Sequence, residues 1–386
     1  MLFAPHAIRW LHPAPFKLRP DMAILRKGPS MLLRLLSSML VLHMTASLVF
    51  AVSGAKPYHL DRNLLPNGCA SCHVGFDFSN GGGSYKCLSC HGPLNKRSKQ
   101  MVMRNIQTKD VSKDFAKNYR HPVFDGKDIH SSREVLPETN STTPRHAVCV
   151  DCHNPHYISG DNVYAGVRGK RIGNFNSTIT KEYELCYLCH GDSANLPVRS
   201  TNKRIEFSTN NPSFHPVEGE GRNLAVISLL RPYRERKGAD NDISIIKCAD
   251  CHGSDDSNSA NGPHGSKYQG ILVDNYATGD GLPESSFNYA LCYRCHKRSS
   301  ILGNESFPFH SRHITGDLNF KGGGTSCYTC HSSHGSTENR YLIRFNRDYV
   351  TESSSGKRQF VEKGTYSFHG ECWLTCHGVD HNPKSY

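Results

Sequence analysis

The sequence is poor in the residues that build a hydrophobic core. Apolar residues make up 37% of the 386 residues, the mean hydropathy is −0.54, and there are only two tryptophans. A globular chain of this size normally carries more apolar side chains, so we expect few long helices or sheets. No cysteine is left over for a disulfide, a free thiol or a separate metal site, because all 16 cysteines fall in pairs that share one pattern.

In that pattern a histidine directly follows the second cysteine, as in Cys149-Val-Asp-Cys-His153. Two thiols three residues apart lie on one side of a single turn, where they can add to the two vinyl groups of a haem while the histidine binds the iron. The last pair has one extra spacer residue. The predicted haem-attaching cysteines are Cys69, Cys72, Cys87, Cys90, Cys149, Cys152, Cys186, Cys189, Cys248, Cys251, Cys292, Cys295, Cys327, Cys330, Cys372 and Cys376. The predicted proximal iron ligands are His73, His91, His153, His190, His252, His296, His331 and His377.

Two other chemistries use paired cysteines. A C-x-x-C pair can be half of a zinc site or a redox-active dithiol. Neither requires a histidine after every second cysteine, and histidine accounts for only 23 of 386 residues. The probability that eight such histidines occur by chance is negligible, so we expect eight covalently attached haem c groups.

Residues 1–55 are typical of a secretory signal peptide, whose start codon we expect to lie nearer Met22. The apolar run Leu32–Val52 follows basic residues and ends in Ser-Gly-Ala, which favours cleavage after Ala55. A transmembrane anchor is the alternative, because the run is long enough to span a bilayer. We therefore expect export to the periplasm, the outer-membrane surface or the extracellular space, with no integral membrane segment after cleavage.

The net charge of +12 does not indicate a nucleic-acid partner. Without residues 1–55 the chain keeps 40 basic and 33 acidic residues, a net charge of +7. Each ferric haem with two neutral imidazoles and two ionised propionates contributes a net charge of about −1, so eight haems bring the holoprotein near neutrality. No nucleic-acid-binding motif accompanies the basic residues.

The motifs recur in pairs, which predicts four two-haem units. After cleavage about 41 residues remain for each haem, too few to surround each one with a large protein core. We therefore expect a haem-cored and mostly irregular fold with short α-helices and few strands. The predicted units are residues 56–135, 136–232, 233–320 and 321–386.

The sixth iron ligand is expected to be a second histidine. Methionine is the usual alternative, but only Met101 and Met103 follow Ala55. We favour histidines that recur at the same place in successive units. The candidate distal ligands are, in order, His156, His264 and His334, then His121, His215, His310 and His313, and then His146 and His369. We place His59, His130 and His381 last.

The doubled motifs resemble the multihaem c-type cytochromes of metal-reducing bacteria. The resemblance covers residues 69–377 and rests on C-x-x-C-H followed by Pro-His or Ser-His-Gly-Ser, on Leu-Cys-Tyr-x-Cys-His and on Phe-His-Pro-Val. It implies bis-histidine haems stacked in a chain and electron transfer outside the cytoplasmic membrane. The implied partners are other multihaem redox proteins and an extracellular or metal electron acceptor. Residues 327–334 also resemble hexahaem filament cytochromes, which implies a homo-oligomer or filament.

Two alternatives to an electron conduit remain. A multihaem reductase of the nitrite, hydroxylamine or tetrathionate kind keeps one iron open, often with a lysine in the motif, but no C-x-x-C-Lys occurs here. A structural or haem-storing filament explains export but not the dense packing of eight irons. We therefore predict an electron carrier in anaerobic respiration or extracellular electron transfer, not an enzyme, with no catalytic residue.

Overall fold

The computed structural model describes residues 57–386 apart from short internal gaps. These gaps are residues 66, 74–83, 98–107, 126–128, 131–133, 139–144, 172–173, 177, 194, 197–199, 224, 237–241 and 317–323. The predicted signal peptide and both Met101 and Met103 lie outside the described residues. Residues Ala55–Tyr386 form one compact unit. In the described part of the chain, no helix combines the length and the apolar content that a membrane span needs.

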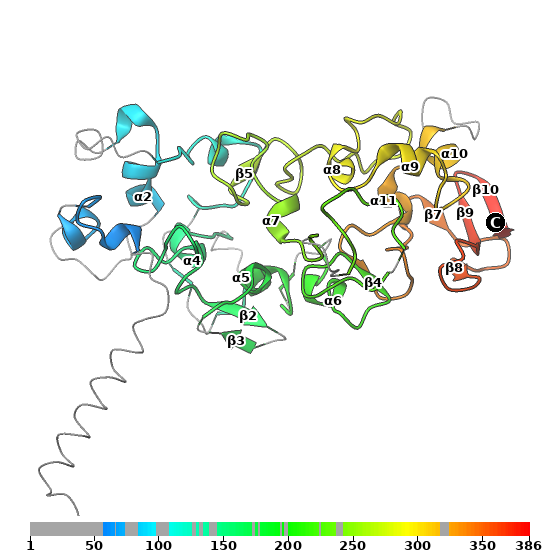
Figure 1. Ribbon diagram of the computed structural model, residues 1–386, viewed down its shortest axis with the longest axis horizontal. Helices are drawn as coiled ribbons and strands as arrows, with labels where there is room; N and C mark the ends of the chain where they lie inside the picture. The colour runs from blue at the N-terminus through cyan, green and yellow to red at the C-terminus, as the bar shows by residue number, and fades with distance from the viewer. Residues whose placement is uncertain are drawn as a thin grey trace, which may run out of the picture. The chain divides into compact units, whose positions relative to one another are not determined.

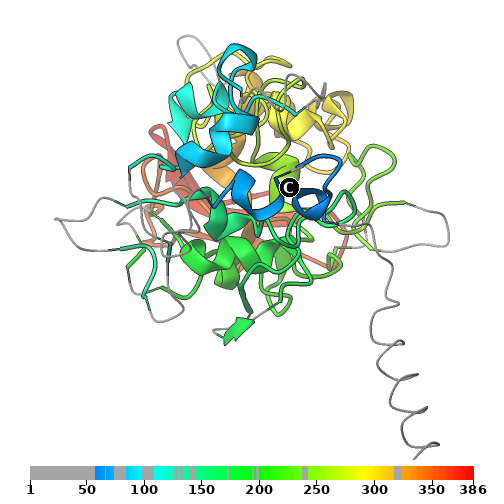
Figure 2. The same cartoon turned by 90° about the vertical axis from the view of Figure 1, so that its left-hand side faces the viewer.

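The helices are short, and most of them contain or border a cysteine motif. The α-helices are α2 (Ser84–His91), α4 (Cys149–Cys152), α5 (Glu182–His190), α6 (Lys203–Glu206), α7 (Cys248–Cys251), α8 (Ala290–Tyr293), α9 (Arg298–Leu302), α10 (His310–Thr315) and α11 (Cys327–Cys330). The 3-10 turns are η1 (Tyr58–Leu60), η2 (Gly68–Ser71), η4 (Leu94–Lys96) and η5 (Asp114–Ala116). Figure 1 shows the motif helices α2, α4, α5, α7, α8 and α11 spaced through the unit, and Figure 2 gives the perpendicular view.

The strands form small antiparallel sheets. They are β1 (Tyr119–Arg120), β2 (Gly169–Arg171), β3 (Asn174–Asn176), β4 (Ser213–Phe214), β5 (Gly265–Ser266), β6 (Gly335–Ser336), β7 (Val350–Thr351), β8 (Gln359–Glu362), β9 (Gly370–Cys376) and β10 (Val379–Ser385). Three sheets have two strands: β1 with β5, β2 with β3 and β4 with β6. In the fourth sheet β9 is paired with β7, β8 and β10.

The predicted fold of short helices, few strands and mostly irregular chain is confirmed. A protein core of ordinary size is not what holds the described residues together. The buried apolar cluster consists of Tyr187, Phe207 and Val217, with Tyr183, Ile246 and Cys248 packed against it. Polar side chains stabilise some of the short elements locally. Asn202, for example, caps α6 by accepting hydrogen bonds from the backbone N–H groups of Arg204 and Ile205.

Two of the small sheets join distant parts of the sequence in the same way. In the first, Tyr119 pairs with Ser266 and Arg120 with Gly265. In the second, the register is Ser213 with Ser336 and Phe214 with Gly335. Each sheet brings a His-Pro-Val segment beside a His-Gly-Ser segment, and each joins two of the four segments predicted from the motif pairs.

Candidate haem-binding sites

Seven of the eight motifs fold as a single turn. We number the motifs 1 to 8 in chain order: Cys69–His73, Cys87–His91, Cys149–His153, Cys186–His190, Cys248–His252, Cys292–His296, Cys327–His331 and Cys372–His377. The helices α4, α7 and α11 run from the first to the second cysteine of motifs 3, 5 and 7. The histidine that follows donates its backbone N–H to the first cysteine, at 2.9 Å for His153 and Cys149. One helical turn keeps both thiols about 5 Å apart along the axis and on one side.

In motifs 1 to 7 the motif histidine faces a second histidine across a nearly constant gap. The seven ring-centroid distances lie between 6.1 and 6.5 Å. The pairs are His73–His156, His91–His59, His153–His264, His190–His121, His252–His334, His296–His215 and His331–His310. Bonds between a metal and an imidazole nitrogen are about 2 Å long, so two imidazoles on one iron have centroids roughly 6 Å apart. These seven sites fit a bis-histidine haem.

Hydrogen bonds on Nδ1 orient many of these rings. The Nδ1 atoms of His121 and His215 lie 2.6 Å from the carbonyl oxygens of Pro263 and Ser333, respectively. The same nitrogen of His252 lies 2.7 Å from a backbone carbonyl, and that of His331 lies 2.9 Å from one. A carbonyl only accepts, so Nδ1 carries the proton and the lone pair of Nε2 is left for a metal.

Burial favours the neutral form of many of the paired imidazoles. Desolvation lowers the pKa of His91, His190 and His296 to about 4. It also lowers the pKa of the facing residues His264 and His334 to about 4. A histidine binds iron through an unprotonated nitrogen, so these rings are ready to act as ligands near neutral pH.

The facing histidines come from elsewhere in the chain by a regular rule. A motif numbered 1, 3 or 5 is faced by the histidine that comes after the motif numbered two higher. His264, for example, comes after motif 5 and faces motif 3. A motif numbered 2, 4 or 6 is faced by the histidine that comes before the motif numbered one lower. His121, for example, comes before motif 3 and faces motif 4. Motif 7 has no motif two places later, and it takes His310 instead.

His59 is the residue that sequence reasoning ranked too low. It faces His91 at 6.1 Å, and its charge lowers the pKa of His91, although burial lowers that pKa more. The signal was its position: it precedes motif 1 as His121 precedes motif 3 and His215 precedes motif 5. Unequal spacing hides that correspondence in the sequence.

The structure places two favoured candidates in other settings. His146 Nδ1 lies 2.8 Å from Glu138 Oε1, beside the ring of His130. His369 is exposed, and its Nδ1 lies 3.0 Å from the backbone oxygen of Tyr386. Both were favoured because they lie just before a motif in the sequence. The histidine that faces a motif can lie far from it in the sequence, as His264, which follows motif 5, faces motif 3.

Of the two candidates on α10, His310 faces motif 7 and His313 does not. His313 Nδ1 lies 2.7 Å from its own helix carbonyl at Phe309, and its ring stacks on Phe307. Burial, and then the nearby His313, lower the pKa of His381. These two histidines therefore lie close to motif 8.

Motif 8 does not fit a doubly attached haem in this conformation. Cys372 and Cys376 lie in the extended strand β9, so their side chains share one face about 13 Å apart along the strand. That is too far for two thiols to reach vinyl groups on neighbouring pyrrole rings. The nitrogen of His377 that would bind iron is also engaged, because its Nε2 lies 2.7 Å from Oδ2 of Asp280. Asp280 is held in turn by the backbone N–H of Ser326 at 2.7 Å.

The cysteines of successive motifs adjoin in an alternating pattern. The first cysteines lie beside each other between motifs 2 and 3, 4 and 5, and 6 and 7. Second cysteines lie near each other between the remaining neighbours: after burial, Cys90 raises the pKa of Cys72, and Cys295 raises that of Cys251. Burial, Asp151 and then Cys189 raise the pKa of Cys152. The attachment sites therefore follow one another in chain order without a break from motif 1 to motif 7.

Comparison with known proteins agrees with this site. Residues 174–341, less than half of the chain, match the family model described as outer membrane cytochrome MtrC/MtrF-like, domains II/IV. The matched segment contains motifs 4 to 7. Neither a curated protein nor a solved structure matches the chain. With its attachment motifs, this match identifies a multihaem c-type cytochrome, an electron-transfer protein of the kind found in metal-reducing bacteria.

Proposed function

We propose that this multihaem c-type cytochrome is an electron conduit in which motifs 1 to 7 hold seven bis-histidine haems in chain order. The observation that carries the proposal is the set of seven facing histidine pairs with centroids 6.1–6.5 Å apart, at attachment sites that adjoin without a gap. Motif 8 would complete the eight haems that the sequence predicts only if β9 bends.

A bound haem iron accepts and returns one electron. The chain's own residues decide how that chemistry is used. Two imidazoles stabilise ferric iron better than an imidazole with a methionine does, which keeps the potential low. Because two histidines are placed to bind the iron at each of the seven paired sites, a haem bound there would leave a substrate no position on the metal.

The adjoining cysteines set the path. The first cysteines of motifs 4 and 5, Cys186 and Cys248, lie beside each other. Haems attached at neighbouring cysteines would have porphyrin edges close to each other. Tunnelling rates fall exponentially with the edge-to-edge distance, so this arrangement favours rapid transfer between successive sites.

We also propose where the conduit works. The predicted signal peptide and the match to an outer-membrane cytochrome family support a place outside the cytoplasmic membrane, at the outer-membrane surface or beyond it. Other multihaem cytochromes and an extracellular or metal acceptor are the partners that this location favours. Filament formation would extend the same conduit from one copy to the next.

Interrupting the row in the middle tests the proposal. The double variant Cys186→Ala/Cys189→Ala removes attachment at motif 4, and Cys69→Ala/Cys72→Ala removes it at motif 1 as a matched control at the end. For protein films on an electrode, we expect the motif 4 variant to leave part of its remaining haems unresponsive at fast scan rates. The control should respond in full. Equal responses from both variants would contradict a single row.

A further inference from the structure

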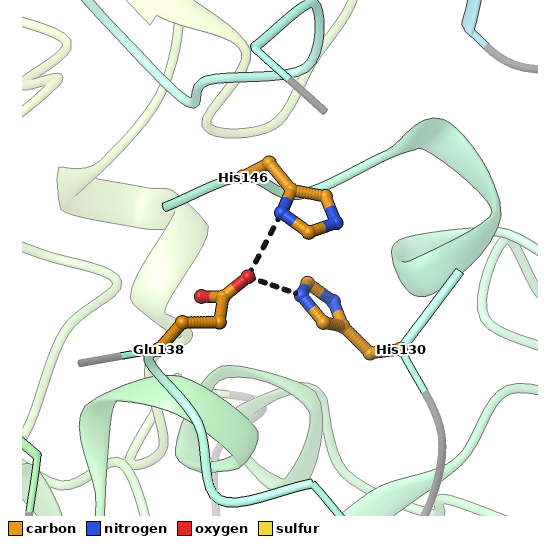
Figure 3. Close-up of side chains that lie close together, drawn as sticks. All are labelled: His130, Glu138 and His146. Atoms are coloured by element: carbon orange, nitrogen blue, oxygen red, sulfur yellow. Dashed lines mark hydrogen bonds and ion pairs between the residues drawn. The ribbon is translucent and has the colours of Figure 1, made fainter. Parts of the chain in front are cut away.

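Three side chains outside the seven facing pairs converge near motif 3 (Figure 3). His130 Nε2 and His146 Nδ1 each lie 2.8 Å from the same oxygen, Oε1 of Glu138. The three donor atoms all lie within 4.8 Å of one another. Two imidazoles and one carboxylate at this spacing are a common ligand set for divalent first-row transition metals.

A carboxylate behind His130 orients its ring. Nδ1 of His130 lies 3.0 Å from Oδ2 of Asp151, and the backbone N–H of His130 donates to Oδ1 at 3.1 Å. Asp151 Oδ2 also accepts from the backbone N–H of Val148 at 2.9 Å, so the carboxylate is itself fixed at the start of α4. Metal-bound histidines typically have such a carboxylate on the far ring nitrogen, because it sets the tautomer that leaves Nε2 for the metal.

The cluster is shielded from water. The side chains of His130, His146 and Glu138 are 6%, 7% and 16% exposed. The two imidazole centroids are only 4.4 Å apart, so a cation shared between the rings is more favourable than a charge on each. The hydrogen bond to Asp151, and then that to Glu138, raise the pKa of His130 to about 9, so a metal would compete with a proton for this ring.

We propose that His130, Glu138 and His146 bind one divalent first-row transition-metal ion, with Asp151 positioning His130. The three protein ligands leave a fourth tetrahedral position for water. The ion fastens the segment before motif 3 to α4 through Asp151. This site is separate from the seven paired sites and contributes no haem ligand.

Zinc binding to the holoprotein tests the proposal. After chelator treatment, the protein is dialysed against increasing Zn²⁺, and zinc and iron are counted by elemental analysis. We expect one zinc per chain. Glu138→Gln and His146→Gln should abolish it, and Asp151→Asn should weaken it by about 10–100-fold. The matched controls Glu134→Gln and His369→Gln should bind as the parent does, and haem content should stay constant in every variant.

The outcomes separate the proposal from a hydrogen-bonded cluster that binds no metal. The zinc absorption edge of the parent protein needs no variant, and we expect a shell of two imidazoles and oxygen. Failure of the parent to retain zinc would overturn the proposal. So would a sulfur-containing shell, or equal binding by Glu138→Gln and the controls.

Discussion

At the residue scale, the role of each histidine follows from which ring nitrogen is engaged. Pro263 and Ser333 hold His121 and His215 by Nδ1, which leaves Nε2 of each for iron. His377 is held by Nε2 on Asp280 instead. The same residue type is thus suited to bind iron in one place and engaged by a carboxylate in another.

Replacing His59 separates the structural assignment from the order that the sequence suggests. His59→Ala should convert one haem from low spin to high spin and leave it attached, because thioether bonds do not depend on the distal ligand. His146→Ala, the matched control, should leave all haems low-spin, since Nδ1 of His146 contacts Glu138 and the ring lies beside that of His130. Electron paramagnetic resonance of the ferric proteins measures both. The reverse result would restore His146 as a haem ligand.

The sequence was a good guide to these residues only where chemistry is local. Each cysteine and its following histidine belong to one turn, so the motif predicts their geometry. Repetition pointed to His156, His264 and His334, but not to the motif each one faces. That choice depends on contacts between residues about a hundred positions apart, such as His153 with His264, which no local pattern records.

At the element scale, two-residue strands position four facing histidines. The pairing of β1 with β5 lets the backbone N–H of His121 donate to the His264 carbonyl at 3.3 Å. The pairing of β4 with β6 does the same for His215 and His334 at 2.9 Å. Each small sheet therefore serves two haem sites at once. Strands this short have no alternation to detect, so the sequence predicted few strands but not these.

Gly335→Ala should disturb two haem sites through one strand. A Cβ at Gly335 would lie 1.9 Å from the backbone oxygen of Glu206, so β6 must move. We expect a loss of about 1–3 kcal/mol of stability and high-spin signals from the sites of His215 and His334. Gly279→Ala is the control, because its Cβ would meet only the Tyr349 hydroxyl at 3.8 Å. Thermal unfolding and spin state are the measurements, and an unchanged Gly335→Ala protein would contradict the role given to this sheet.

At the scale of the whole molecule, the order of the motifs along the chain is also their order in space. Facing histidines cross between motifs, so none of the four predicted segments contains all of the histidines that face its own motifs. Residues Ala55–Tyr386 accordingly form one compact unit. The sequence predicted the paired motifs but not this interlocking, because motif spacing carries no information about which segments pack together.

The intact mass of the exported protein decides the haem count. Since β9 separates Cys372 from Cys376 and His377 is held by Asp280, we expect the chain plus seven haems. The motif 8 variant Cys372→Ala/Cys376→Ala should then carry the same number as the parent. A parent mass that includes eight haems would mean that β9 bends to form the attachment turn.

The most direct test of the account is whether any iron in the native protein is open. Seven facing pairs predict that every haem held by motifs 1 to 7 is six-coordinate. The spectrum of the fully reduced protein should therefore be unchanged by carbon monoxide, and that of the oxidised protein unchanged by nitrite. A haem present at one per chain that is high-spin, binds carbon monoxide and turns over nitrite, hydroxylamine or tetrathionate would contradict the conduit and establish a reductase.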